Sequence, residues 1–185
     1  MLIALTGTPG TGKTTIASIL KKSDITVLSL KEIAETHQFI ESFDEDRQSN
    51  IVDIEAVGLY IDANYAKDDW IIVEGHLSHL LPSVQTSIVL RCHPKSLRIR
   101  LLSRDWSWKK IRENLEAEAL DIILCEAIDQ HGIQHIVEFD STDLSVEQIA
   151  SDIQLILQGK KAKLSLKPGS IDWSESLFDS EIMEK

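Results

Sequence analysis

The sequence predicts a doubly wound α/β fold built on a parallel five-stranded sheet. Three observations predict it: five short runs rich in Val and Ile, helical periodicity between them, and a glycine-rich motif directly after the first run. Strands that alternate with helices pair in parallel and are covered on both faces. Such strands read as apolar runs without strict alternation. The five runs are residues 2–6, 25–30, 70–75, 86–91 and 134–139.

Between these runs, apolar residues recur at the spacing of a helix. Three such segments are residues 14–22, 51–66 and 107–130, where apolar side chains lie three and four positions apart. Pro94 stands where the first turn of a helix tolerates proline. Ser145 opens the last predicted helix, with Gln148 three residues later in the capping-box position.

The pattern ends at about residue 160, so we expect a domain over 1–159 and a tail over 160–185. The tail begins with basic residues, passes a Pro-Gly pair and becomes acidic. This composition is typical of a mobile or loosely packed segment. Trp173 and Phe178 lie within it and could dock on the domain or on a partner.

Composition limits the function classes. A chain of 185 residues with 43% hydrophobic residues suits one globular domain. Its formal net charge of -11 argues against binding to free nucleic acid, because a phosphate backbone requires a basic surface. The acidity favours either simple solubility or a basic protein partner.

The expected location is the cytoplasm. Cys92 and Cys125 have no C-x-x-C spacing and resemble buried thiols of a reducing compartment. No apolar stretch approaches the roughly 20 residues that span a bilayer, so no membrane association is expected. Met1 leads directly into the first predicted strand, which leaves no room for a signal peptide.

The strongest motif is "GTPGTGKTT", residues 7–15, which fits G-x-x-x-x-G-K-[ST]. In this motif, glycines let backbone N–H groups surround phosphate oxygens at the start of a helix. Lys13 is expected to reach the β- and γ-phosphates of a nucleoside triphosphate, and the Thr14 hydroxyl to bind Mg²⁺. A strand before the motif and a helix after it are the context that it requires.

A carboxylate and two histidines follow the third strand. Glu74 ends "WIIVE" and is expected to hold the metal through water, because ligands bind at the carboxyl edge of such sheets. His76 could act beside the γ-phosphate as an acid, a base or a residue that orients water, or could simply bond backbone. His79 is expected to be structural, and a zinc site is not expected because no further Cys or His lies close in the sequence.

Arginines are concentrated in one region. Guanidinium groups neutralise the charge that phosphoryl transfer spreads over equatorial oxygens, so this region is a candidate catalytic segment. Arg100 and Arg104 share a helix face, and Arg104 precedes "DWSWKK", which is typical of a short lid. We interpret Arg98 and Arg112 as solvent-exposed residues. The five arginines are Arg91, Arg98, Arg100, Arg104 and Arg112.

Three stretches together resemble a known family. "GTPGTGKTT", "EGHLSHLLP" and "VLRCHPKSLRIRLLSRDWSWKKIRENLEAEALDIILCEA" are similar to the isoenzyme-6-type adenylate kinases, the archaeal and nuclear-type members, over about residues 1–158. The resemblance implies a broad-specificity nucleoside monophosphate (NMP) kinase with ATPase activity. It also implies a role in small ribosomal subunit maturation, with a basic small-subunit ribosomal protein as partner.

The resemblance also implies roles for individual residues. The NMP-binding segment would run over about 30–53 and include Arg47, and the lid would run over about 103–113. Two departures concern the lid and the metal: Asp105 and Trp106 stand where relatives often have Gly and Tyr, and Glu74 replaces an Asp. The ATP phosphates would be held by Gly10, Gly12, Lys13, Thr14, Thr15 and the lid residue Arg104.

The acceptor of the γ-phosphoryl group separates three hypotheses. The first is a kinase that converts ATP and AMP to two ADP with Mg²⁺, in which Lys13, Arg104 and His76 are the catalytic candidates. The second is an assembly factor in which ATP hydrolysis drives a switch on a protein partner. The third is a P-loop kinase of a non-nucleotide acceptor. The long segment between the second and third strands favours the first.

Overall fold

The computed structural model describes residues 1–23, 25–45 and 49–185. Five strands form one parallel sheet in the order β2-β5-β1-β6-β7, and they confirm the five runs predicted from the sequence. In the register of the central strand, Leu5 lies opposite Glu74 on one side and Ile88 on the other. The strands are β1 (Leu2–Thr6), β2 (Thr26–Ser29), β5 (Ile71–Glu74), β6 (Thr86–Arg91) and β7 (Ile136–Asp140).

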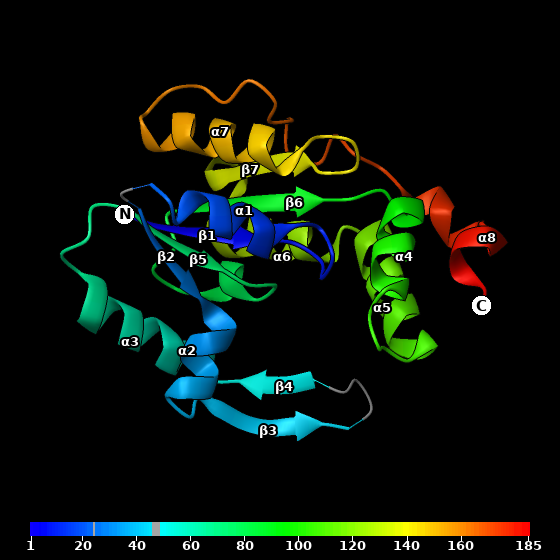
Figure 1. The fold of residues 1–185 in the computed structure, drawn as a ribbon, viewed down its shortest axis with the longest axis horizontal. Coiled ribbons are helices and arrows are strands. Elements are labelled where there is room, and N and C mark those ends of the chain that lie inside the picture. The colour runs from blue at the N-terminus through cyan, green and yellow to red at the C-terminus, as the bar shows by residue number, and fades with distance from the viewer. Residues whose placement is uncertain (24, 46–48) are drawn as a thin grey trace.

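Helices cover both faces of this sheet (Figure 1). The α-helices are α1 (Lys13–Leu20), α2 (Leu30–Thr36), α3 (Ile54–Tyr65), α4 (Pro94–Leu102), α5 (Trp108–Ala119), α6 (Ile122–His131), α7 (Val146–Leu157) and α8 (Ser180–Met183). Short 3₁₀ turns are η1 (Ser78–Leu80), η2 (Ile133–His135) and η3 (Ser174–Phe178). The doubly wound α/β fold is therefore as predicted.

The central strand shows why its sequence is apolar throughout. Ile3 and Leu5 pack among side chains of α1 and α7, whereas Leu2 and Ala4 pack among those of α2 and α3. Every residue of β1 is buried. Since both faces of a strand are covered, alternation between polar and apolar residues disappears.

Two local predictions about helix starts are confirmed. The Ser145 side chain accepts the Gln148 backbone N–H, and the Gln148 side chain accepts the Ser145 backbone N–H, so the capping box is complete. Pro94 occupies the first turn of α4. Both are short-range features, which a sequence pattern specifies directly.

One segment predicted as a single helical stretch forms two helices in the structure. Residues 107–130 form two helices, α5 and α6, separated at Leu120 and Asp121. Asp121 has a left-handed backbone with φ of 58°, which ends the helical path. Its carboxylate accepts a hydrogen bond from Arg91 Nη2. A long-range ion pair therefore accompanies the turn that divides the segment.

The predicted NMP-binding segment contains a hairpin that the sequence pattern does not reveal. Strands β3 (Ile40–Asp44) and β4 (Ser49–Val52) pair antiparallel in a sheet of their own. In Figure 1 this hairpin projects from the main sheet beside α2. Its strands are largely exposed, so they carry no apolar run that would predict them.

The tail differs from the mobile or loosely packed segment that its composition predicts. Ile182 and Met183 are buried against α4 and α5, in a cluster that includes Leu97 and Leu101. Earlier in the tail, the Leu166 backbone N–H donates to the Glu138 carbonyl at 2.8 Å. The tail is docked because its few apolar residues meet an apolar surface formed by helices distant in sequence.

The two aromatic residues of the tail have different environments. Trp173 lies over the Arg91 guanidinium, with 5.1 Å between the guanidinium carbon and the ring centroid. Phe178 is 90% exposed. The ring of Trp173 therefore docks on the domain, as one of the two predicted alternatives has it, whereas the ring of Phe178 does not.

The remaining global expectations concern thiols and membranes. Both cysteines are free thiols; Cys92 is buried as predicted, whereas Cys125 is exposed on α6. Within the described residues, no helix combines the length and apolar character that crossing a bilayer requires.

We expect Ile182→Ala to lower the free energy of unfolding by about 2 kcal/mol, because it leaves a cavity between the tail and the helices α4 and α5. Urea denaturation measures this loss, and amide hydrogen exchange shows whether the tail is released. Phe178→Ala is the matched control, because its exposed ring should contribute less than about 0.5 kcal/mol. Equal stability of the two variants would contradict the docking of α8.

Candidate active site

The phosphate loop follows β1 and ends at the first residue of α1. Its backbone has positive φ at all three of its glycines, Gly7, Gly10 and Gly12. Gly7 has φ of 135°, and a Cβ there would lie 2.3 Å from the Leu90 carbonyl oxygen. Gly12 has φ of 100° and is the N-cap of α1, so it has no side chain to satisfy the first N–H groups. A helix start of this kind leaves backbone N–H groups available for an anion.

Lys13 lies inside the phosphate loop. Its Nζ donates to the carbonyl oxygens of Gly7 at 2.6 Å and Thr8 at 2.9 Å. Burial lowers the pKa of Lys13 to about 8, Glu74 and Glu118 oppose this shift, and Arg104 adds to it. The ammonium group is therefore held at the loop and stays cationic near neutral pH.

Thr14 and Glu74 lie together, as predicted from two separate motifs. The Thr14 hydroxyl donates to Glu74 Oε2 at 3.2 Å. Glu74 ends β5 beside the phosphate loop, at the carboxyl edge of the sheet. A hydroxyl and a carboxylate are hard oxygen ligands, and Mg²⁺ takes few of these from proteins and completes its shell with phosphates and water. The pair therefore fits a phosphate-linked Mg²⁺.

His76 faces the same cleft as Lys13. Desolvation within the cleft, together with the charges of Lys13, His79 and Lys110, lowers the pKa of His76 to about 4. The side chain is open to the cleft, and at neutral pH the imidazole is uncharged. It can accept or donate a hydrogen bond at that pH, although it is a weaker base than an unperturbed histidine.

His79 is a structural residue, in agreement with the prediction. It is fully buried, its Nδ1 lies 2.9 Å from the Thr6 hydroxyl and its Nε2 lies 3.1 Å from Glu126. Both ring nitrogens are thus occupied by protein partners. Among the described residues, no cluster of His, Cys, Asp and Glu could hold a metal ion by itself.

Two of the five clustered arginines lie at the phosphate loop. Arg100 donates to the Gly10 carbonyl at 3.4 Å and to the carbonyls of Ser141 at 2.9 Å and Thr142 at 3.2 Å. It therefore joins the loop to the segment after β7. Arg104 follows α4 and lines the cleft near Lys13, whose pKa its charge helps to lower.

The lid is short. Residues 103–107 connect α4 to α5, and the predicted lid of 103–113 adds the first turns of α5. Trp106 lies at its centre, with its ring centroid 4.8 Å from the Arg104 guanidinium carbon and 4.6 Å from Lys110 Nζ. The sequence suggests that Trp106 could stack on a base, whereas in the structure its ring contacts two cations.

The other three arginines lie elsewhere. Arg91 is only 2% exposed and is bound by Glu118, Asp121 and Glu138, so it is not a phosphate ligand. Arg112 is exposed and pairs with Glu116 at 2.8 Å, as expected for a solvated face. Arg98 differs from that expectation, because it is half-buried and donates to the Glu184 carbonyl in the tail.

The candidate residues at the phosphate loop border one cleft of about 1390 Å³, which Arg100 and Arg104 also line. It contains the phosphate loop, Glu74, His76 and the lid residues, and it extends to Leu144 and Val146 at one end. On another side it reaches Lys31 of α2 and hairpin residues that include Asn50. Arg47, predicted to bind the monophosphate, lies outside the described residues.

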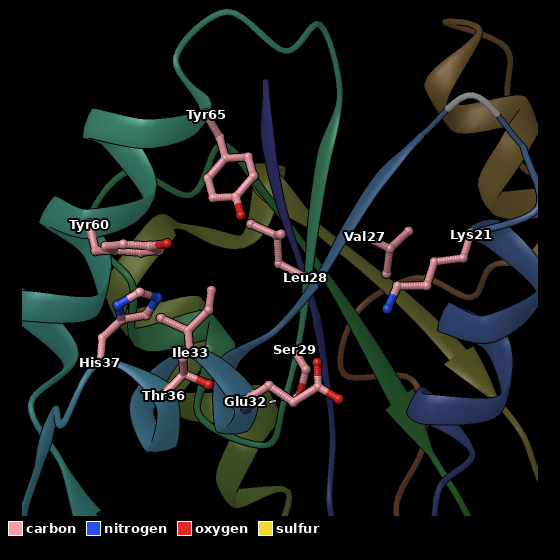
Figure 2. A pocket seen from close by; sticks show the side chains of 10 residues that line it. All are labelled: Lys21, Val27, Leu28, Ser29, Glu32, Ile33, Thr36, His37, Tyr60 and Tyr65. Atoms are coloured by element: carbon pink, nitrogen blue, oxygen red, sulfur yellow. Dashed lines mark hydrogen bonds between the residues drawn. The ribbon is translucent and has the colours of Figure 1, made fainter.

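A second, smaller cavity is separate from this cleft. It has a volume of about 220 Å³ and lies on the outer side of edge strand β2, between α1, α2 and α3. Figure 2 shows the Tyr60 ring over the His37 ring, with 4.0 Å between their centroids, and Lys21 across the opening. Four of its lining residues, Glu32, Ile33, Thr36 and His37, fall within the predicted NMP-binding segment of 30–53. The phosphate loop, Glu74, His76 and Arg104 all line the larger cleft instead, so we place the candidate site there.

Sequence reasoning missed a contact between the phosphate loop and α5. The Thr8 hydroxyl donates to Glu118 Oε2 in α5, although 110 residues separate the two. Glu118 belongs to the "ENLEAE" stretch, so its position was marked by a motif. Its contact with Thr8 left no signal in the sequence.

Comparisons with known proteins agree with this geometry. A family profile described as an AAA domain matches residues 3–121. Two archaeal relatives are named "Putative adenylate kinase". The protein from Archaeoglobus fulgidus is 44% identical over 100% of this chain and 99% of its own length. The protein from Methanocaldococcus jannaschii is 38% identical over 100% and 99%.

Among solved structures, a shikimate kinase from Bacteroides thetaiotaomicron has a similar fold. The TM-score is 0.52 at 19% identity, over 85% of this chain and 98% of that one. This likeness concerns the fold alone. The matches to the two archaeal relatives extend over the whole chain. The chain therefore belongs to the archaeal adenylate kinase family of P-loop kinases.

Proposed function

We propose that the protein transfers the γ-phosphoryl group of ATP to AMP and so forms two molecules of ADP. The observation that carries the proposal is the single cleft of about 1390 Å³ that joins the phosphate loop to the β3–β4 hairpin. Pockets for one small ligand are usually roughly 300–1,000 Å³. The cleft therefore has room for a donor and an acceptor nucleotide together.

The donor phosphates would lie on the phosphate loop. Backbone N–H groups from Gly10 to Thr15 at the start of α1 suit an anion, and Lys13 adds a cation. The Leu144 and Val146 end of the cleft offers apolar surface for the adenine. Thr14 would bind Mg²⁺ directly and Glu74 through water; when bound, the ion neutralises phosphate charge.

The transfer itself needs positioning more than proton chemistry. An oxygen of the AMP phosphate attacks the γ-phosphorus, the bond to the oxygen bridging to the β-phosphate breaks, and that electron pair leaves with ADP. The attacking oxygen is already ionised, so no general base is needed. Lys13 and Arg104 would neutralise charge on the transferred group, and the lid would exclude water.

The acceptor would lie between α2 and the hairpin. Lys31 and Asn50 line this side, and Arg47 remains a predicted ligand of the monophosphate. The hairpin strands are exposed rather than built into an enclosed pocket. An open wall of this kind supports a broad specificity, in which monophosphates other than AMP are also accepted.

The first test measures ADP formed from ATP with and without AMP, using Lys13→Met as the variant. We expect strong stimulation by AMP with ADP as the sole product. Lys13→Met should slow transfer by about 10²–10³, because a preorganised cation is lost where charge develops. Circular dichroism checks that the variant is folded. Transfer within about threefold of the parent would refute the role of Lys13, and no response to AMP would refute the acceptor.

Arg104→Ala should lower kcat more than it weakens ATP binding. Arg104 leads into the lid and contacts Trp106, so its contact with phosphate should strengthen only when the lid closes. Steady-state kinetics give kcat, and calorimetry gives the dissociation constant of ATP. Arg112→Ala is the control, because that exposed arginine pairs with Glu116. A higher KM at unchanged kcat would make Arg104 a ground-state ligand.

A second candidate function is ATP hydrolysis that assists maturation of the small ribosomal subunit in the cytoplasm. His76 supports it, because a neutral imidazole open to the cleft could orient an attacking water. The net charge of -11 supports a basic small-subunit ribosomal protein as partner. In this alternative the kinase activity would be secondary.

His76→Gly should therefore impair hydrolysis without AMP more than it impairs AMP phosphorylation. Water must be positioned and deprotonated. Because the lowered pKa makes His76 a weak base, we expect a loss at the lower end of what acid–base catalysis contributes, about 10²-fold. Both rates are measured on one folded protein at saturating Mg²⁺ and ATP, with and without a basic ribosomal-protein fragment. His76→Gln, which keeps a hydrogen-bonding group, is the control. Equal losses would make His76 a structural residue of the turn, and a larger kinase loss would make it an acceptor-site residue.

A further inference from the structure

Glu118 joins three separate segments through one buried carboxylate. It lies in the last turn of α5 and is 2% exposed. Its Oε1 accepts Arg91 Nε at 2.9 Å and the Cys92 backbone N–H at 3.0 Å, and its Oε2 accepts the Thr8 hydroxyl. The end of the lid helix, the end of β6 and the phosphate loop therefore meet at this group.

Arg91 fixes Glu118 in turn. Its Nη2 donates to the Glu118 backbone carbonyl at 3.0 Å, so both the side chain and the main chain of Glu118 are bound. Its Nη1 donates to Glu138 at 2.8 Å, and the Gly169 N–H donates to the other oxygen of Glu138 at 2.9 Å. Because these groups are buried and mutually satisfied, the carboxylate has one defined position.

Thr8 connects Glu118 to Lys13 in the phosphate loop. Its hydroxyl is bound to Glu118, while its carbonyl accepts Lys13 Nζ at 2.9 Å. Thr8 is itself buried, at 2% exposure. The lid cations Arg104 and Lys110 flank the start of α5, so one helix connects the lid at one end to the phosphate loop at the other.

We propose that Glu118 is a positioning residue for phosphoryl transfer, which holds Thr8 and with it Lys13 in a fixed register with the lid helix α5. The assignment rests on the proposed function, because it concerns the group that meets the transferred phosphoryl. It acts through Thr8 and touches no substrate. A displacement of about 1 Å at a reacting centre can cost as much as 10²-fold in rate, so such a contact has measurable consequences.

The test compares Thr8→Val with Thr8→Ser. Valine matches the shape of threonine but lacks the hydroxyl, whereas serine keeps it, and neither change removes a partner of Arg91. We expect Thr8→Val to lower kcat for ADP formation about tenfold and to weaken ATP binding about threefold, with Thr8→Ser within about twofold of the parent. If the Thr8 hydroxyl served only to keep the protein folded, Thr8→Val would leave a smaller fraction of chains able to bind ATP. Calorimetry would then show fewer ATP sites per chain with an unchanged dissociation constant.

Glu118→Leu adds a double-mutant cycle, because leucine can form no hydrogen bond with the Thr8 hydroxyl. If Glu118 acts through Thr8, Thr8→Val should cause no further loss in the Glu118→Leu background, to within about twofold. Losses that multiply would overturn the proposal, as would equal kcat and ATP affinity in Thr8→Val and Thr8→Ser. Should Glu118→Leu not fold, the Thr8 pair decides alone. If the unmodified protein shows no AMP-dependent transfer, the proposed function is refuted. The ATP dissociation constants of Thr8→Val and Thr8→Ser would still show whether the contact between Thr8 and Glu118 positions the phosphate loop.

Discussion

The burial of one positive charge constrains much of this structure. Arg91 ends the strand β6 with 2% of its surface exposed, and an isolated buried guanidinium would be very unfavourable. It is compensated by three carboxylates from different elements, at the end of α5, at the turn after it and on β7. Each carboxylate must reach the same place, so the ends of these elements are fixed relative to one another.

The position of the phosphate loop follows from the same constraint. The carboxylate that neutralises Arg91 from α5 also accepts the Thr8 hydroxyl, so the loop contacts the network that organises the sheet edge. Arg100 adds an independent link, from the Gly10 carbonyl to the segment after β7. The loop is thus held from two sides by guanidinium and carboxylate groups that need touch no nucleotide.

Sequence alone predicted the parts of the molecule that local rules specify. The apolar runs predicted the strands of the sheet, and the spacing of glycine and lysine predicted the phosphate loop. The position of Glu74 at the end of a strand predicted that it lies beside Thr14. The hairpin was missed because its exposed strands carry no apolar pattern. The break at Asp121 and the burial of Arg91 were missed because they depend on contacts up to 47 residues apart, which leave no local signature.

Charge in the cleft shows how an acidic chain can accept a polyphosphate. Among the described residues, five Lys or Arg side chains and five Asp or Glu side chains line it, so the cleft has no formal excess of positive charge. Long-range attraction cannot supply the affinity of a chain with a net charge of -11. Binding must instead depend on groups aimed at the phosphates from short range: the N–H groups at the start of α1, the ammonium of Lys13 and the hard oxygen pair of Thr14 and Glu74. Such groups are effective only when they are held in place, which is why the buried contacts behind the phosphate loop matter as much as the residues that face the cleft.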